Sequence, residues 1–378
     1  MPRNFDLSAI KKIFLILLSA LVVAAGFFFL SEKLWPKDGS LPLFRENVFS
    51  EEEMSALKHS TPFENFSSRG LPKDSIAAID KPKFISIKQA DEFLSDEDAG
   101  VGLEYGDEAR FYPLRILSWH EAVNDSIAGV PIAVTYSPLT ETAIVFKRKV
   151  EGKILEFGVS QKLLNSNLIL YDRATESLWS QILEEAVVGE MTGKKLETLP
   201  IEILSWKNWK ELRPQSKVLS KDTGFSKPYG DDPYAGYRAS DTIFFPIAHR
   251  DDRLRPKETI FGISSNTGFK AYPAAALKNR TAASDMIGDF PLIVLMDTDH
   301  DTARFFSRIL GKETLEFEAT ENGIKDTKTG SVWNVFGQSF GGWYAGKKLT
   351  PLPALRSYWF SWAAFHPETE VYEAGNVK

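Results

Sequence analysis

An internal repeat constrains the fold of this chain more than any other feature of its sequence. Residues 101–157 align with residues 261–317 at a constant offset of 160 positions, without a gap, and 16 of the 57 aligned pairs are identical. Ordinary residue frequencies would give roughly 3 identical pairs by chance. Two copies of one unit must satisfy the same backbone and the same kind of core. The sequence therefore predicts a tandem duplication, and the positions that differ are where one copy can specialise.

The repeat continues past residue 157, after a loop that is six residues shorter in the second copy. A motif that runs from Asp172 to Trp179 returns from Asp326 to Trp333. An Asp with a Thr three residues later is typical of a turn whose side-chain oxygens accept hydrogen bonds from backbone N–H groups. We expect this motif to hold the fold, with the tryptophan packed behind the turn.

The organisation of the chain follows from the repeat. Residues 31–80 are interpreted as a stalk and lead-in, residues 81–220 as repeat one and residues 256–378 as repeat two. The Gly-, Pro- and Asp-rich residues 221–255 connect the two repeats. The predicted fold class is α+β, mostly strand, duplicated in tandem and preceded by one N-terminal transmembrane helix.

Local patterns place the elements of the first repeat. Helices are expected at 51–59, 114–126 and 205–212, the second because Pro113 suits a helix start and apolar residues recur at helical spacing. Glu151-Gly152 lies between two alternating segments and predicts a hairpin turn. The predicted strands are 101–105, 109–112, 131–136, 143–150, 153–159, 168–171 and 186–191.

The N-terminal region predicts a membrane anchor. Ile13–Leu30 is 18 residues without a charge, which as a helix spans about 27 Å, close to the hydrocarbon core of about 30 Å. Arg3, Lys11 and Lys12 precede it, so residues 1–12 are expected in the cytoplasm and the bulk of the chain outside it, periplasmic or at the cell surface. A cleaved signal peptide is the alternative, although the apolar stretch is long for one.

Composition excludes several classes of function. The chain has no cysteine, so disulfides, thiol catalysis and cysteine-zinc sites are excluded and the repeats must be held by packing. A net charge of −6 without a basic stripe argues against nonspecific nucleic-acid binding. The residues specify no cofactor.

Three residues are candidates for catalysis. Ser137 follows a predicted strand, and His120 and Asn124 lie one turn apart on the predicted helix before it. Serine and histidine can act as nucleophile and base when they share a hydrogen bond. We expect His120 to point inward toward the Tyr136–Thr142 loop; a histidine satisfied in the core is the alternative.

Polar residues of this loop and of the repeated motifs are candidates for ligand binding. They are Tyr112, Asp125, Thr140, Thr142 and Asp172.

The second copy replaces the serine loop with an acidic one, Asp297-Thr298-Asp299-His300-Asp301. Three carboxylates and an imidazole suit a hard or borderline divalent cation. The candidate metal ligands are Asp297, Asp299, His300 and Asp301. A solvated acidic turn is the alternative, because the spacing fits no established ligand motif.

The motifs together resemble the DUF 3179 family, whose function is unknown. The resemblance covers residues 80–375, approximately, and implies no activity, since the family has none to transfer. The stretches that carry it are Ala109–Pro113 (ARFYP), Trp119–Asp125 (WHExxND), Tyr136–Ala143 (YxPLxxTA) and Leu170–Gln181 (LYDRxTxSxWxQ).

One departure from the family pattern is important. The resemblance implies Cys in many relatives at the positions of Ser137 and often Thr140, where a thiol pair would suggest metal or redox work. This chain has neither thiol. The departure favours a binding or scaffold module with a small-molecule or protein partner, its site between the repeats or in the 137–142 loop. A hydrolase-like enzyme and a metal-binding module are the alternatives.

Overall fold

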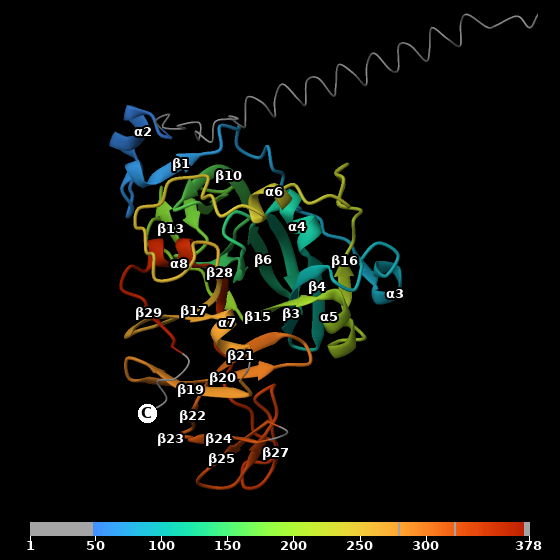
Figure 1. The fold of residues 1–378 in the computed structure, drawn as a ribbon. Helices are drawn as coiled ribbons and strands as arrows, with labels where there is room; N and C mark the ends of the chain where they lie inside the picture. The colour runs from blue at the N-terminus through green and yellow to red at the C-terminus, as the bar shows by residue number, and fades with distance from the viewer. Residues whose placement is uncertain (1–47, 279, 321–322, 374–378) are drawn as a thin grey trace, which may run out of the picture. The chain divides into compact units, whose positions relative to one another are not determined.

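The computed structural model describes residues 48–278, 280–320 and 323–373, and this part of the chain is a strand-rich α+β structure, as predicted (Figure 1). The predicted anchor at 13–30 lies outside the described residues. Among those described, no helix has both the length and the apolar character needed to cross a membrane. The elements before β3 are α2 (Glu51–Ala56), the 3-10 helix η1 (Phe63–Asn65) and β1 (Phe66–Ser68), followed at the start of repeat one by β2 (Phe84–Ser86) and α3 (Ile87–Ala90).

Repeat one is a series of short strands with two helices. In chain order its elements are β3 (Ala99–Tyr105), β4 (Glu108–Pro113), α4 (Leu114–His120), β5 (Ala122–Ile127), β6 (Val130–Ser137), β7 (Thr142–Lys147), β8 (Lys149–Val150), β9 (Lys153–Ile154), β10 (Phe157–Leu164), β11 (Asn167–Asp172), β12 (Leu178–Ser180), β13 (Glu185–Val188), β14 (Thr198–Leu199), β15 (Ile201–Ser205), α5 (Trp206–Leu212) and β16 (Lys217–Leu219).

Helix α6 (Ala235–Arg238) lies in the connector, and repeat two follows. Its elements are β17 (Thr259–Ser265), β18 (Gly268–Pro273), α7 (Ala274–Leu277), β19 (Ala282–Ile287), β20 (Phe290–Asp297), β21 (Thr302–Ser307), β22 (Ile309–Leu310), β23 (Glu313–Thr314), β24 (Phe317–Thr320), β25 (Gly323–Asp326), β26 (Val332–Trp333), β27 (Ser339–Gly341), β28 (Leu355–Tyr358), α8 (Trp359–Phe365) and β29 (Glu370–Val371).

The strands of the two repeats pair in matching registers. Asp125 lies opposite Ile132 in the β5–β6 pair, and Asp285 lies opposite Leu292 in the β19–β20 pair, 160 residues later. The parallel pairing of β16 with β4 also recurs, between β29 and β18. Sheet β15-β3-β4-β16-β2 thus corresponds to β28-β17-β18-β29, and sheet β1-β10-β11-β12-β13 to β24-β25-β26-β27.

Sheet β14-β7-β6-β5 forms the middle layer of repeat one. Alternate residues of a strand point to opposite faces, and on β6 Val134 packs in one apolar cluster while its neighbour Ala133 packs in another. The first cluster contains Val101 of β3 and the second contains Trp179 of β12. The middle sheet is therefore buried on both faces, and the loop that leaves β6 joins its two inner strands, β6 and β7, at their ends.

A glycine and a tryptophan pack against each other in each repeat. A Cβ atom on Gly102 of β3 would lie 2.3 Å from the Trp209 ring of α5, and one on Gly262 of β17 would lie 2.4 Å from the Trp362 ring of α8. Non-bonded carbon atoms do not approach each other this closely, so each indole requires a glycine beneath it. This close approach explains why both residues recur in the sequence repeat.

The predicted helix at 114–126 is wrong in its second half. Helix α4 ends at His120, Glu121 takes a left-handed φ of 57°, and the chain continues as strand β5. Val123 and Ile127 are four residues apart, a spacing that places two side chains on one face of a helix and also on one face of a strand. The apolar pattern alone therefore could not distinguish the two structures.

The hairpin predicted at Glu151-Gly152 is confirmed. Lys149 pairs with Ile154 and Val150 pairs with Lys153 across the turn. Both turn residues have positive φ, 49° and 83°, as two-residue hairpin turns of this hand require.

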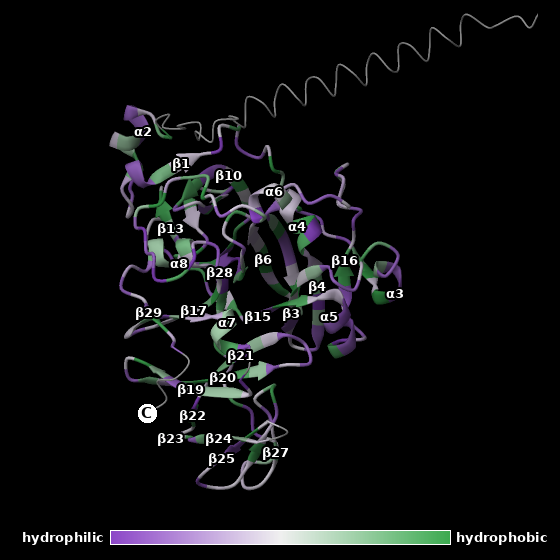
Figure 2. Ribbon diagram, in the orientation of Figure 1, coloured by the Kyte–Doolittle hydropathy of each residue, from purple (hydrophilic) through white to green (hydrophobic). Residues whose placement is uncertain are grey.

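An N-terminal cover, defined as residues 48–66, lies on the outer face of the β10–β13 sheet. Its residues Phe49 and Phe66 are buried in one apolar cluster with Val187 and Val188 of β13. In Figure 2 the exposed helix α2 within the cover is mostly purple, whereas the buried helix α8 is white to pale green. The cover closes a sheet face that would otherwise be apolar and exposed.

Candidate functional site

A cavity of about 460 Å³ lies between the two repeats. Strands β3 and β15 and helix α5 line it from repeat one, while β21 and parts of the segment 336–356 line it from repeat two. Its size falls in the range of pockets that bind small molecules, roughly 300–1,000 Å³. The lining residues that carry charge or an aromatic ring are Glu104, Glu202, Trp209, Arg213, Phe261, Arg304, Phe305, Phe306, Phe336, Lys348 and Arg356.

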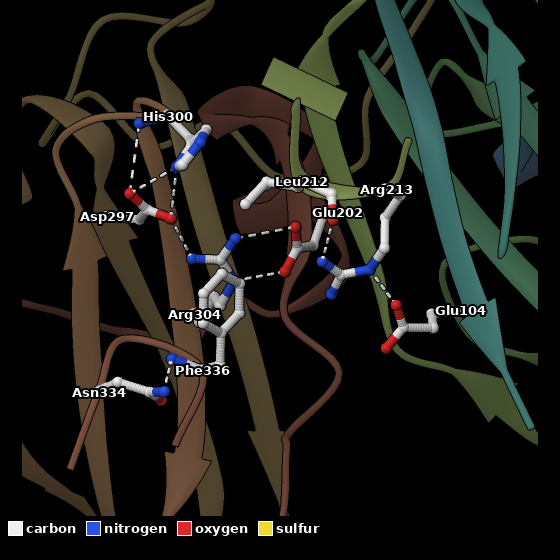
Figure 3. A network of polar contacts seen from close by, with 9 residues as sticks. All are labelled: Glu104, Glu202, Leu212, Arg213, Asp297, His300, Arg304, Asn334 and Phe336. Carbon is white, nitrogen blue, oxygen red and sulfur yellow. Dashed lines mark hydrogen bonds and ion pairs between the residues drawn. The ribbon is translucent and has the colours of Figure 1, made fainter. Parts of the chain in front are cut away.

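Arg304 links the two repeats at this cavity (Figure 3). Its nearly buried guanidinium pairs with Asp297 at 2.7 Å on its own repeat, and its Nη2 donates to Glu202 Oε2 at 3.1 Å on the other. Burial lowers the pKa of Arg304, but the two carboxylates outweigh it and raise that pKa above its usual value. The arginine is therefore a fixed positive charge in the wall.

Asp297 is held by the same network. His300 Nδ1 lies 2.9 Å from both of its carboxylate oxygens. Burial raises the pKa of Asp297, yet the hydrogen bonds from Arg304 and His300 outweigh it, so the pKa lies below its usual value. Asn208 of helix α5 donates to the His300 carbonyl at 2.8 Å, which adds a second link between the repeats.

Phe336 forms an aromatic part of the wall. The Arg304 Cζ atom lies 4.4 Å from its ring centroid and the Arg213 Cζ atom lies 5.7 Å from it. Guanidinium groups within about 6 Å of a ring are attracted to its face. Arg213 in turn pairs with Glu104 of β3 (Figure 3). The ring and the two arginines hold one another in place.

Four cationic side chains line the cavity, and three of them pair with carboxylates: Arg213 with Glu104, Arg304 with Glu202 and Asp297, and Arg356 with Glu141. Lys348 forms no ion pair within the described part of the chain. Arg356 pairs with Glu141 at 3.1 Å, but its buried Nε has no hydrogen-bond partner among the described residues. Lys348 is therefore left for an anion, next to aromatic surface that can hold an apolar body.

The loop 137–142 lies at the contact between the repeats, but none of its residues lines the cavity. Tyr358 N–H donates to the Thr140 carbonyl at 2.8 Å. The Thr142 hydroxyl lies 3.1 Å from that of Ser357, and Asn167 donates to Thr140 Oγ1 at 2.9 Å. Both threonines are fully buried, so they serve the contact between the repeats and not an open pocket.

Ser137 is fully buried at the end of β6. Its hydroxyl has no hydrogen-bond partner within the described residues. By strand alternation it shares the face of Thr135, whose hydroxyl accepts a hydrogen bond from Gln181. No hydrogen bond joins Ser137 to His120 or Asn124 in the described structure.

The structure buries His120, as expected, but the expectation that it faces the Tyr136–Thr142 loop is wrong. Its Nδ1 lies 2.7 Å from the Ala77 carbonyl, which can only accept, so Nδ1 carries the proton. Nε2 then accepts from the Tyr229 hydroxyl at 2.6 Å. Burial lowers the pKa of His120 and Lys227 adds to this, while the hydrogen bond to the Ala77 carbonyl opposes it, so the net direction favours the neutral ring.

Asn124 does not lie one helical turn from His120, because it belongs to β5. Its amide donates to Asp80 and to the Phe157 carbonyl, both at 2.8 Å, and its oxygen accepts from the Phe157 N–H at 2.9 Å. These bonds fasten β5 to β10. The structure does not bring the three candidate catalytic residues together.

Asp125 and Tyr112 form a structural pair that both repeats share. The Tyr112 hydroxyl donates to Asp125 at 2.7 Å, and Tyr272 donates to Asp285 at 2.9 Å. Arg110 completes the first pair as an ion partner at 2.5 Å.

Asp172 is fully buried and receives four hydrogen bonds. Its donors are the N–H groups of Ala174 and Thr175, the Thr175 hydroxyl and the Trp179 indole. The carboxylate has the turn-forming role that its motif predicts, and no lining contact with the cavity.

The four candidate metal ligands in the acidic loop of repeat two have two different environments. Asp297 and His300 are engaged with each other and with Arg304, while Asp299 and Asp301 are exposed. Among the described residues, no three His, Cys, Asp or Glu side chains are grouped so that they could hold a metal ion.

Sequence reasoning missed the charged residues that line the cavity. Arg304 occupies the position of Ile144 in the first repeat, and Phe336 that of Leu183. A buried apolar residue exchanged for an arginine between two copies is the kind of mismatch that marks specialisation, so Arg304 was detectable. Glu202 was not, because only the packing of the repeats brings it to Arg304.

A family model described as "Protein of unknown function (DUF3179)" matches residues 73–369. No curated protein and no solved structure gave a significant match to the chain.

Proposed function

Because the chain belongs to the DUF3179 family, whose description assigns no activity, we propose its function from the cavity alone: it binds a small organic anion between its two repeats. The observation that carries the proposal is Lys348, which lines the cavity beside an aromatic wall and has no ion partner among the described residues. Lys348 is the group that receives the acid, and Phe336 packs against the apolar body. The protein is thus a ligand-binding module.

A pair of probe ligands tests the charge requirement. We expect 2-naphthoate to bind, measured by isothermal titration calorimetry, and its neutral analogue 2-naphthamide to bind at least about 10-fold more weakly. Lys348→Gln should weaken naphthoate binding about 10-fold, since it removes a charge-assisted hydrogen bond.

Lys347→Gln is the matched control, because this neighbouring lysine does not line the cavity. It should leave naphthoate binding unchanged. Equal affinities for acid and amide, or equal losses in the two lysine variants, would exclude the proposed site.

We also propose that residues 13–30 anchor this module in the membrane with the repeats outside the cytoplasm. The support is an uncharged stretch of spanning length that follows the basic residues Arg3, Lys11 and Lys12. The protein should purify from the membrane fraction with the intact mass of the full chain. A soluble exported form whose N-terminus begins after Gly26 would contradict the anchor.

A further inference from the structure

Strand β13 of repeat one receives a backbone partner from the N-terminal cover. Ser60 N–H donates to the Val187 carbonyl at 3.0 Å, and Gly189 N–H donates to the Lys58 carbonyl at 2.8 Å. His59 forms a bridge with Val188 between these two bonds. Residues 58–60 therefore extend the sheet at this edge, and Val187 is fully buried beneath them.

The same edge exists in repeat two on β27. Trp179 pairs with Ala186 and Trp333 pairs with Ser339, so Phe340 occupies the position of Val187 and Gly342 that of Gly189. Both glycines have positive φ, 101° and 86°, and each packs against the serine before the repeated tryptophan. The backbone groups that bind residues 58–60 are therefore reproduced in repeat two.

In repeat two this edge has no cover. Within the described residues, no strand or bridge pairs with 340–342 on the side away from β26. Phe340 is 61% exposed and Trp343 is 82% exposed, whereas Val187 is completely buried. An unpaired edge next to exposed aromatic rings is a template for an added strand.

Two lysines beside this edge have lost their ion partners. In repeat one Lys194 pairs with Glu151, and Lys195 pairs with Glu185. The equivalent lysines are Lys347 and Lys348, but the positions of the glutamates hold glycine and glutamine, Gly311 and Gln338. Neither lysine forms an ion pair within the described residues, and no acidic residue occurs between Asp326 and Glu368. The edge is thus aromatic and cationic.

We propose that the β27 edge is a docking site for an extended acidic peptide of a partner protein, which adds to the sheet as residues 58–60 add to β13. The peptide backbone pairs with Phe340 and Gly342, its apolar or aromatic side chains pack on Phe340 and Trp343, and its carboxylates meet Lys347. The cover itself has this chemistry, because residues 48–66 contain four glutamates, one lysine and three phenylalanines. The site is separate from the cavity, except that Lys348 borders both.

A synthetic peptide with the sequence of residues 48–66 is the probe, added to the full-length protein and followed by fluorescence anisotropy. It should bind, and both Trp343→Ala and Lys347→Glu should weaken its binding about 10-fold. Hydrogen exchange of the Gly342 amide should slow when the peptide binds, since this N–H gains a backbone partner. Ile154→Ser, which removes an exposed apolar side chain on β9, is the matched control and should have no effect.

Three results would overturn the proposal. Peptide binding that survives both substitutions would mean that the probe displaces the cover from β13. Cosedimentation with phosphatidylserine vesicles that is lost in Trp343→Ala would assign the surface to a membrane. Self-association of the protein alone that is lost in Trp343→Ala would assign it to a second copy. Trp343→Ala should leave naphthoate binding intact, so failure of this site and failure of the cavity can be told apart.

Discussion

Replacing Asp172 with Ala should lower the free energy of unfolding by about 4 kcal/mol, because the change leaves several buried donors without a partner, each costing roughly 1–3 kcal/mol. The carboxylate receives four hydrogen bonds, and the Trp179 indole donates one of them at 2.9 Å. No solvent reaches the carboxylate or the indole to replace it. Urea denaturation of the parent protein and the variant measures this loss of unfolding free energy.

The second repeat provides the control. Asp326 receives hydrogen bonds from the Thr329 N–H and hydroxyl, but the buried Trp333 Nε1 has no partner among the described residues. Asp326→Ala should therefore cost about 2 kcal/mol less than Asp172→Ala. Equal losses in the two variants would show that the indole hydrogen bond adds no stability.

Acidification should destabilise the protein through His366, which is buried at the end of α8. Its ring stacks on Phe269 with centroids 4.1 Å apart and lies 4.2 Å from the Trp362 ring. Burial in these aromatic surroundings lowers the pKa of His366 to about 4. The folded protein therefore holds the neutral ring at a pH where the unfolded chain already binds a proton.

The direction of the pH effect follows from linkage. Because the folded pKa lies below the unfolded value of about 6.5, the stability is fully present above pH 6.5, approximately, and is lost as the pH falls toward 4. At pH 5 the loss relative to pH 7.5 should be about 2 kcal/mol. His120, whose pKa burial also lowers, acts in the same direction.

His366→Phe isolates this contribution. The variant keeps an aromatic ring against Phe269 but cannot be protonated, so urea midpoints at pH 7.5 and 5 should differ less than in the parent protein. A parent and a variant with the same pH dependence would mean that folding does not lower the pKa of His366.

The sequence predicted the strand-rich α+β class and the Glu151-Gly152 hairpin, because a repeated pattern and a two-residue turn are local signals. It did not predict where α4 ends. The helix ends where Glu121 adopts a left-handed backbone conformation. The side chain of Glu121 forms a buried ion pair with Arg69 at 2.8 Å. The spacing of apolar residues around the helix gives no information about Arg69, which lies 52 residues away in the chain.

The candidate site was predictable only in part. A site between the repeats was one of the two places expected for a ligand, and the cavity lies there. The named residues His120 and Asn124 fasten other parts of the fold, since Tyr229 and Phe157 bind them. Glu202 and Lys348 line the cavity because two repeats meet there, and the orientation of one repeat on the other is not a local property of either sequence.

The glycine beneath each repeated tryptophan has a consequence for how such a gene can be rearranged. The Trp209 ring leaves no room for a side chain at position 102, and the Trp362 ring leaves none at position 262. A side chain at either glycine would therefore require a smaller residue in place of its tryptophan. Because the two pairs are equivalent, an exchange of whole α5 and α8 segments between the repeats would still join every glycine to an indole.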